Sequence, residues 1–169
     1  MTAHTCYIGL GSNLSQPAEQ LHQAVNSMAQ IELTTVRKCS SLYSSKPMGP
    51  QDQPDYVNAV VEIETNLTPH ALLAAMQKIE LDQGRVRKGQ RWGPRTLDLD
   101  ILLFGNQVIE SQDLTIPHVG MKSREFVLFP LHEIAPDLVL PCGNSLIFVL
   151  NSVSRNGLVK FEQDVKSEC

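Results

Sequence analysis

Residues 91–104 organise the chain, and they read Arg91-Trp92-Gly93-Pro94-Arg95-Thr96-Leu97-Asp98-Leu99-Asp100-Ile101-Leu102-Leu103-Phe104. Leu97, Leu99, Ile101 and Leu103 recur at every second position, which predicts a strand with one apolar face. Asp98 and Asp100 then share the opposite face, about 6–7 Å apart along the strand. Two ionised carboxylates among aliphatic neighbours are costly unless something positive lies between them. The pattern indicates a cation site; the alternative is a solvent-facing pair that binds the nearby arginines.

Magnesium is the cation that suits these two carboxylates. Mg²⁺ takes one or two carboxylates and leaves its other positions to water and phosphate oxygens. Two such ions about 3.5–4 Å apart could share both aspartates and clamp a phosphoryl group. Arg91 and Arg95 flank a Gly-Pro corner and suit bidentate phosphate contacts. We therefore expect a magnesium–nucleotide site.

The composition is that of an ordinary globular protein with 169 residues, 42% of them hydrophobic and 19% charged. This length favours a single domain over residues 1–169, with a polar tail from about residue 153. A formal net charge of −4 gives no general affinity for nucleic acid or anionic membranes. No apolar run approaches the ~20 residues that span a bilayer. We expect a monomer with small-molecule substrates and no nucleic-acid or membrane partner.

The four cysteines are scattered and lack metal-ligand spacing; they are Cys6, Cys39, Cys142 and Cys169. This usage predicts reduced thiols and a cytoplasmic location. The first residues lack the basic and apolar regions of a signal peptide, which supports the same expectation.

The order of elements predicts the fold class. We expect a strand near residues 5–10, a helix from Pro17, a strand over 33–43, a strand from Tyr56, a helix from Pro69 and the strand that follows Thr96. This β-α-β-β-α-β order is typical of a ferredoxin-like α+β sandwich, an antiparallel sheet backed by two helices. The apolar, proline-interrupted segment 126–150 would form a C-terminal extension with its own packing layer.

Glycines follow the first strand in the run Gly9-Leu10-Gly11-Ser12-Asn13. The run resembles the start of a dinucleotide-binding fingerprint, but Leu14 stands where the third glycine is needed. We therefore expect these glycines to form a flexible turn between strand and helix.

Two loops beside the predicted sheet suggest ligand contacts. Segment 44–55 holds three prolines and is longer than a hairpin needs, and Tyr56 and Asn58 share a face at its exit. An aromatic ring beside a primary amide can stack on and hydrogen-bond a flat heterocycle, although a surface Tyr and a strand-end Asn would look the same. Segment 85–95 holds five of the fourteen Lys and Arg residues, which indicates either a solvated loop or a phosphate-gripping one.

Three motifs resemble one enzyme family closely, and they are Gly49-Pro50-Gln51-Asp52-Gln53-Pro54-Asp55-Tyr56, Gly84-Arg85-Val86-Arg87 and the run from Arg91 to Asp100. The similarity is to 6-hydroxymethyl-7,8-dihydropterin pyrophosphokinase, a folate-pathway diphosphotransferase, and it extends from Tyr7 to about Leu150. The family moves the pyrophosphoryl group of ATP to a pterin alcohol and releases AMP.

The resemblance implies roles for individual residues. Asp98 and Asp100 match the pair that binds two Mg²⁺ ions, and Arg85 and Arg95 match positions that act with them in catalysis. The positions implied for ATP are Gln77, Glu80, Arg87, Trp92, Arg95, Ile101, Thr115, His118 and Arg124. The positions implied for the pterin are Ser45, Met48, Tyr56, Asn58 and Phe126, with Tyr56 and Phe126 enclosing the ring and Asn58 reading its polar edge.

Three positions depart from the family pattern. Asp113 stands where bacterial members carry an arginine, Val119 stands where they carry a tyrosine, and Lys46 replaces a proline. The first two affect the expected nucleotide contacts, and the third affects the stiffness of the pterin-side loop.

Three other functions remain alternatives on the sequence alone. A ferredoxin-like RNA-binding module would need exposed aromatics and a basic face, which the negative net charge disfavours. A magnesium-dependent nuclease would also use paired aspartates. A non-catalytic pterin- or nucleotide-binding protein could have the same site residues and would differ only in producing no AMP.

Overall fold

A computed structural model describes residues 3–12, 17–45, 56–82, 97–118, 121, 124–153 and 159–164. Strand β1 (His4–Ser12) pairs antiparallel with β4 (Tyr56–Thr65) on one side and with β5 (Asp98–Phe104) on the other. Two shorter strands, β2 (Thr34–Cys39) and β3 (Ser41–Ser45), both pair with β4. The last strand, β8 (Val159–Asp164), pairs with β3, so β5 and β8 end the main strand order.

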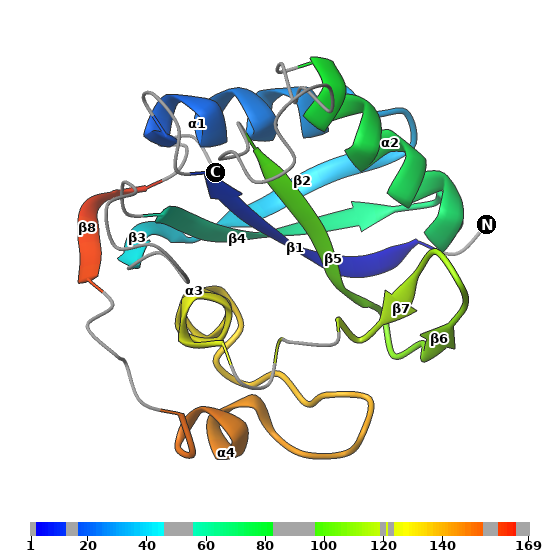
Figure 1. The fold of residues 1–169 in the computed structure, drawn as a ribbon. Coiled ribbons are helices and arrows are strands. Elements are labelled where there is room, and N and C mark those ends of the chain that lie inside the picture. The colour runs from blue at the N-terminus through cyan, green and yellow to red at the C-terminus, as the bar shows by residue number, and fades with distance from the viewer. Residues whose placement is uncertain are drawn as a thin grey trace.

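Two helices cover one face of this sheet. Helix α1 (Pro17–Met28) begins with a proline at its first position, where the missing N–H costs nothing. Helix α2 (Pro69–Asp82) also begins with proline, and the Thr68 hydroxyl accepts a hydrogen bond from the Ala71 N–H at 3.2 Å. Figure 1 shows both helices on the same side of the strands.

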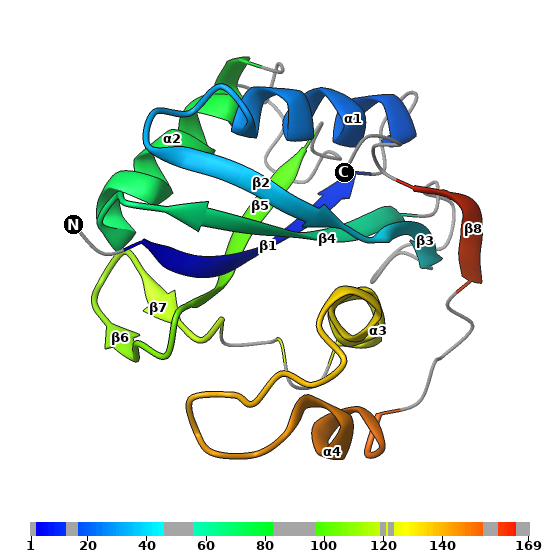
Figure 2. The same ribbon diagram turned by 180° about the vertical axis from the view of Figure 1, so that it is seen from behind.

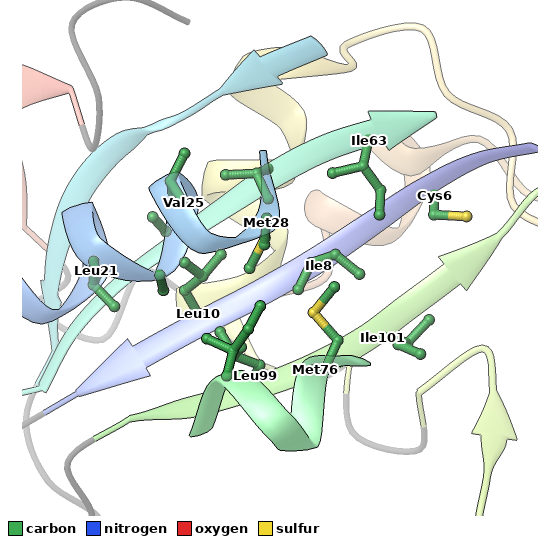
Figure 3. Packing of buried hydrophobic residues seen from close by; sticks show 14 of the residues in the cluster. Cys6, Ile8, Leu10, Leu21, Val25, Met28, Ile63, Met76, Leu99 and Ile101 are labelled. Atoms are coloured by element: carbon green, nitrogen blue, oxygen red, sulfur yellow. The ribbon is translucent and has the colours of Figure 1, made fainter. Parts of the chain in front are cut away.

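The main core lies between these helices and the sheet. Side chains at helical spacing, such as Leu21, Val25 and Met28, are buried against Ile8 and Leu10 of β1. Figure 3 shows these residues together with those that α2, β4 and β5 contribute, which are Met76, Ile63, Leu99 and Ile101. Alternation along each strand therefore sends one set of side chains to α1 and α2 and leaves the other set on the opposite face.

A second layer covers part of the opposite face. Helix α3 (Glu125–Ile134) packs against β4 and β3, and the short helix α4 (Leu146–Leu150) packs behind it. Figures 1 and 2 show α3 and α4 on the side of the sheet away from α1 and α2. This layer has its own apolar core, in which Tyr7, Val60 and Leu102 of the sheet meet α3 and α4. A two-stranded sheet of β6 (Ile109–Glu110) and β7 (Thr115–Ile116) follows β5.

The antiparallel sheet, the two backing helices and the C-terminal layer match the sequence-based expectations. Three details do not. The predicted strand over 33–43 is two strands, β2 and β3, interrupted at Ser40, whose side chain accepts the Val60 N–H. The polar end of the chain, expected to fray, forms β8 over residues 159–164, where Val and Phe alternate with charged residues. Gly9 and Gly11 lie inside β1 rather than in a turn.

The apolar face of β5 also differs from simple alternation. The β1–β5 register shifts between Tyr7 and Ile8, so β5 holds one residue more than its partner strand there. Leu102 and Leu103 both join the α3-side core, and Phe104 returns to the α1–α2 core. The expectation that Leu103 shares a face with Leu97 is therefore wrong, whereas the expectation that Asp98 and Asp100 lie on the face opposite Leu99 is confirmed.

The cysteines do not all behave as expected. Cys6 and Cys142 are thiols, as predicted, but Cys39 is disulfide-bonded, because distance along the sequence does not report proximity in the fold. Burial raises the pKa of the Cys6 thiol to about 12, so it stays a neutral core group. None of the helices in the described ranges is long and apolar enough to cross a membrane.

Candidate active site

A row of four residues crosses the sheet on the α3 side. Tyr43 of β3 lies opposite Asn58 of β4, Asn58 lies opposite Gly11 of β1, and Gly11 lies opposite Asp98 of β5. Directly opposed residues in antiparallel strands point to the same face. With strands 4.7–4.9 Å apart, Asn58 and Asp98 lie about 10 Å from each other. An amide and a carboxylate thus share one surface, separated by a residue without a side chain.

Gly11 is required by the close approach of Asn58. A methyl group added at Gly11 would lie 3.0 Å from Oδ1 of Asn58, closer than ordinary contacts allow. Asn58 is only 5% exposed, so its amide has little room to move. The neighbouring Gly9, opposite Asp100, is covered instead by the Leu102 side chain, whose Cδ2 atom would lie 3.3 Å from an added methyl. Gly11 therefore leaves room for Asn58, and Gly9 leaves room for Leu102.

Asp98 is the β5 end of this row, and Asp100 follows two residues later on the same face of β5. Asp98 is half-buried and Asp100 is more exposed, and both lie on the face opposite the core residue Leu99. His118 lies beside them: its backbone N–H donates to the Leu102 carbonyl at 3.0 Å, and its Nε2 is 3.8 Å from Oδ1 of Asp100. The structure thus brings together three of the residues that the sequence predicted for metal and nucleotide.

The donor chemistry of the aspartate pair fits a hard divalent cation. Within the described ranges, no group of three or more His, Cys, Asp or Glu side chains is arranged to hold a metal ion by itself. A zinc-type site, which needs three or four protein ligands, therefore finds no support in that part of the chain. Mg²⁺ needs only one or two carboxylates when phosphate oxygens complete its shell.

The first turn of α3 brings two further predicted residues to the same face. Arg124 is the residue before the helix, and its Cζ atom lies 5.8 Å from the centre of the Phe126 ring. Such a geometry allows a cation–π attraction that orients both side chains. Phe126, predicted for the pterin, packs against the α3-side core, and Arg124, predicted for ATP, lies next to it. The two proposed subsites are therefore adjacent at this point.

The outer edge of β5 receives Glu80 from α2. The Glu80 carboxylate is buried, and its Oε2 accepts the Leu99 N–H at 2.8 Å. Backbone groups of residues i and i+2 on a strand point the same way, so the N–H and C=O of Ile101 also point away from β1. The Ile101 side chain is buried in the α1–α2 core, so its side chain cannot contact a nucleotide from outside. Its backbone is the group available for the predicted role.

Other predicted nucleotide residues surround the same edge at a greater distance from the row. Gln77 is exposed on α2, and Thr115 is exposed on β7, which packs beside β5. Asp113, one of the departures, receives a hydrogen bond from the Ser111 hydroxyl at 3.0 Å and lies 3.2 Å from Nε2 of His70. The Ser111 hydrogen bond and, to a smaller extent, His70 lower the pKa of Asp113. This carboxylate thus ties the β6–β7 turn to the start of α2.

Several predicted residues lie outside the described part of the structure, and they are Met48, Arg85, Arg87, Trp92 and Arg95. The departures Lys46 and Val119 lie outside it as well. Ser45 and Tyr56 are described as paired strand residues, Ser45 at the end of β3 and Tyr56 at the start of β4. Their roles stay predictions.

Sequence reasoning missed two features of this face. Gly11 was assigned to a turn, although two glycines at i and i+2 inside a strand are a sign of close approach on one face. Tyr43 drew no attention because its importance comes from its position opposite Asn58, and pairing between strands cannot be seen in a single sequence.

Comparisons with known proteins point to one family. The sequence model of 7,8-dihydro-6-hydroxymethylpterin-pyrophosphokinase (HPPK) matches residues 7–136. A Haemophilus influenzae protein named 2-amino-4-hydroxy-6-hydroxymethyldihydropteridine pyrophosphokinase is 54% identical over 156 residues, covering 92% of this chain and 97% of the relative. A Pseudomonas aeruginosa protein of the same name is 50% identical over 152 residues, covering 90% of this chain and 93% of the relative.

Solved structures show the same fold at low sequence identity. The wild-type HPPK-DHPS of Plasmodium falciparum with pteroate aligns with a TM-score of 0.71 at 15% identity. The alignment covers 89% of this chain and 42% of that one, so the present chain spans less than half of that protein. Together with the match over residues 7–136 and the relatives at 50% and 54% identity, this places the chain in the 7,8-dihydro-6-hydroxymethylpterin-pyrophosphokinase family.

Proposed function

We propose that this chain transfers the pyrophosphoryl group of ATP to the hydroxymethyl oxygen of 6-hydroxymethyl-7,8-dihydropterin in a magnesium-dependent reaction. The products are AMP and the pterin pyrophosphate, which serves folate biosynthesis. The observation that carries this proposal is the row Tyr43–Asn58–Gly11–Asp98, because it sets a buried amide and a carboxylate on one face about 10 Å apart. Family membership supplies the substrate class.

The pterin subsite lies over Asn58 and Gly11. A primary amide offers both a donor and an acceptor, which matches the alternating donors and acceptors along the edge of a pterin ring. Gly11 has no side chain that would hold a flat ring away from the sheet. Phe126 would stack on this ring from α3, and we assign Tyr56, Ser45 and Met48 to the other walls.

The nucleotide subsite lies along the outer edge of β5. The backbone of Ile101 offers a donor and an acceptor there, and Glu80, Gln77, Thr115 and His118 surround it. We assign Arg124 and Trp92 to the nucleotide and Arg85, Arg87 and Arg95 to its phosphates. This route carries the triphosphate from the edge of β5 towards Asp98, Asp100 and the pterin.

Asp98 and Asp100 would hold two Mg²⁺ ions. Such ions would neutralise charge on the ATP phosphates and stabilise the negative charge that develops during transfer. The protein contributes carboxylates fixed on a paired strand, so little reorganisation is needed when the substrates bind.

The chemistry proposed is an in-line displacement at the β-phosphorus. The hydroxymethyl oxygen forms the new O–P bond, the bond to the α,β-bridging oxygen breaks, and AMP leaves with that electron pair. The hydroxyl proton passes to solvent, because no side chain in the described part of the site is singled out as a general base. The residues of this chain act by holding oxygen and phosphorus in line, which is the larger part of catalysis in phosphoryl transfer.

We also assign residues 4–104 to the ferredoxin-like arrangement. The support is the strand order β5-β1-β4, with β2 and β3 together on the far side of β4, and two helices on one face. In this arrangement β2 and β3 take the place of one interrupted strand.

The direct test is product analysis. Incubation of the chain with ATP, Mg²⁺ and the pterin alcohol should give AMP and pyrophosphorylated pterin in equal amounts, measured by chromatography and mass spectrometry. Formation of ADP and pterin monophosphate would make it an ordinary kinase. Binding of both substrates without product would make it a binding protein.

Asp98→Asn and Asp100→Asn test the metal assignment. Each change removes a carboxylate charge while keeping the side-chain size, so turnover should fall by roughly 100-fold or more while pterin affinity changes little. Turnover and pterin fluorescence titrations, each at several Mg²⁺ concentrations, separate the two effects. Glu64→Gln is the matched control, since Glu64 lies on β4 about 20 Å along the strand from Asn58. Equal loss of turnover and pterin binding would show a structural pair instead.

Gly11→Ala tests the close approach over β1. The added methyl group would make the Asn58 amide shift by a few tenths of an ångström, so pterin affinity should fall by roughly 10-fold, with ATP affinity changed far less. Gly9→Ala is the control, because its methyl group would also make a tight contact, 3.3 Å from Cδ2 of Leu102, but would not touch Asn58. Calorimetry with pterin and with a nonhydrolysable ATP analogue measures both. Equal effects of the two alanines on pterin affinity would refute the role of Gly11.

A further inference from the structure

Glu133, in the last turn of α3, makes an unusual set of contacts with β3. Its Oε1 accepts the Tyr43 hydroxyl at 2.7 Å, and its Oε2 accepts the Ser41 hydroxyl at 2.8 Å. The Ser41 N–H also donates to both oxygens, at 3.2 and 3.1 Å. Both carboxylate oxygens therefore accept hydrogen bonds from a single strand, and bonds to a charged acceptor are stronger than neutral ones.

A second contact joins the same end of α3 to the sheet. Lys38 of β2 extends its Nζ to the Ile134 carbonyl at 3.5 Å. A cation at the C-terminal end of a helix also complements the helix dipole. The last turn of α3 is thus attached to β2 and β3 by polar groups, in addition to the apolar packing along its length.

The periodicity of α3 links this attachment to the proposed site. Phe126 lies seven residues before Glu133, which in an α-helix is two turns, so both residues lie on the same stripe. Their separation along the helix axis is about 10 Å. Because Glu133 contacts β3, this stripe faces the sheet. Rotation or sliding of α3 about this attachment would therefore move the Phe126 ring relative to the sheet.

Tyr43 connects the attachment to the amide. Tyr43 is the residue of β3 directly opposite Asn58, and both side chains lie on the α3 side. Tyr43, which donates a hydrogen bond to Glu133, is therefore the neighbour of Asn58, which we assign to the polar edge of the pterin. The Glu133 carboxylate thus contacts Tyr43 in the row, and it lies on the same helix as Phe126. It can therefore fix the distance between the Phe126 ring and the row.

We propose that Glu133 is a positioning residue that sets the width of the pterin slot between Phe126 and the row at Asn58. This inference rests on the proposed function, since it assigns the slot to the pterin. Glu133 does not touch the substrate in this account. It acts through α3 and Tyr43, so its loss should weaken the pterin subsite and leave the nucleotide edge of β5 intact.

Glu133→Gln is the first test. Glutamine keeps the size but removes the negative charge and replaces one acceptor oxygen with an NH2 donor, so the charge-assisted hydrogen bonds from Tyr43 and Ser41 cannot all be kept. The dissociation constant for the pterin alcohol should rise by about 10-fold, while that for a nonhydrolysable ATP analogue stays within about 2-fold. Calorimetry of both ligands on the purified full chain measures this split, and thermal unfolding reports any loss of stability separately.

Glu62→Gln is the matched control. Glu62 accepts the Tyr7 hydroxyl at 2.8 Å, the same kind of bond on the same face of the sheet, but it lies on β4 about 13 Å along the strand from Asn58 and joins β1 rather than α3. Glu62→Gln should lower the melting temperature about as much as Glu133→Gln does, and it should leave pterin affinity unchanged. Tyr43→Phe removes one donor and keeps the ring, so it should reproduce part of the Glu133→Gln effect. It replaces Glu133→Gln as the test if Glu133→Gln does not fold.

The outcomes separate this inference from the function on which it rests. If the unmodified chain binds pterin and produces AMP, yet Glu133→Gln or Tyr43→Phe weakens pterin and ATP analogue equally, or weakens neither, the positioning role is wrong and the function stands. If the unmodified chain fails to bind the pterin, both the function and this inference are overturned.

Discussion

The close contact between Asn58 and Gly11 is the constraint on which the rest of the site depends. Asn58 is buried on a central strand, and its amide oxygen occupies the space that any larger residue at position 11 would fill. This contact places the amide next to a residue without a side chain, in the row that ends at Asp98. We propose that a flat ring lies over this row with its substituent directed at the carboxylates. A side chain at position 11 would separate the amide from the metal site by a barrier.

The two faces of the sheet differ in role: the α1–α2 face forms the main core, and the α3 face carries the residues of the proposed site. The α1–α2 face is filled by aliphatic side chains and fixes the register of β1, β4 and β5. The α3 face has a smaller core and also carries the polar residues, so the site lies on a surface whose strands are already held from behind. Glu80 extends this support to the edge, because its carboxylate holds the Leu99 N–H between the two aspartates. Positions set by paired strands need little adjustment when charged substrates bind.

Much of the fold and part of the site could be predicted from the sequence. Alternation placed Asp98 and Asp100 together and placed Asn58 on the face opposite Val57 and Ala59, because these patterns depend on local geometry alone. The β-bulge at Leu102 and the pairing of β8 could not be predicted, because each depends on how distant strands meet. The assignment of Gly11 failed for the same reason.

The central claim is that pterin and metal occupy one face of the sheet, over the row from Asn58 to Asp98. A crystal structure of the chain with the pterin alcohol, a nonhydrolysable ATP analogue and Mn²⁺, located by anomalous scattering, tests it most directly. The account predicts the pterin edge within hydrogen-bonding distance of the Asn58 amide and metal ions ligated by Asp98 and Asp100. Pterin bound away from Asn58, or metal bound without either aspartate, would contradict it.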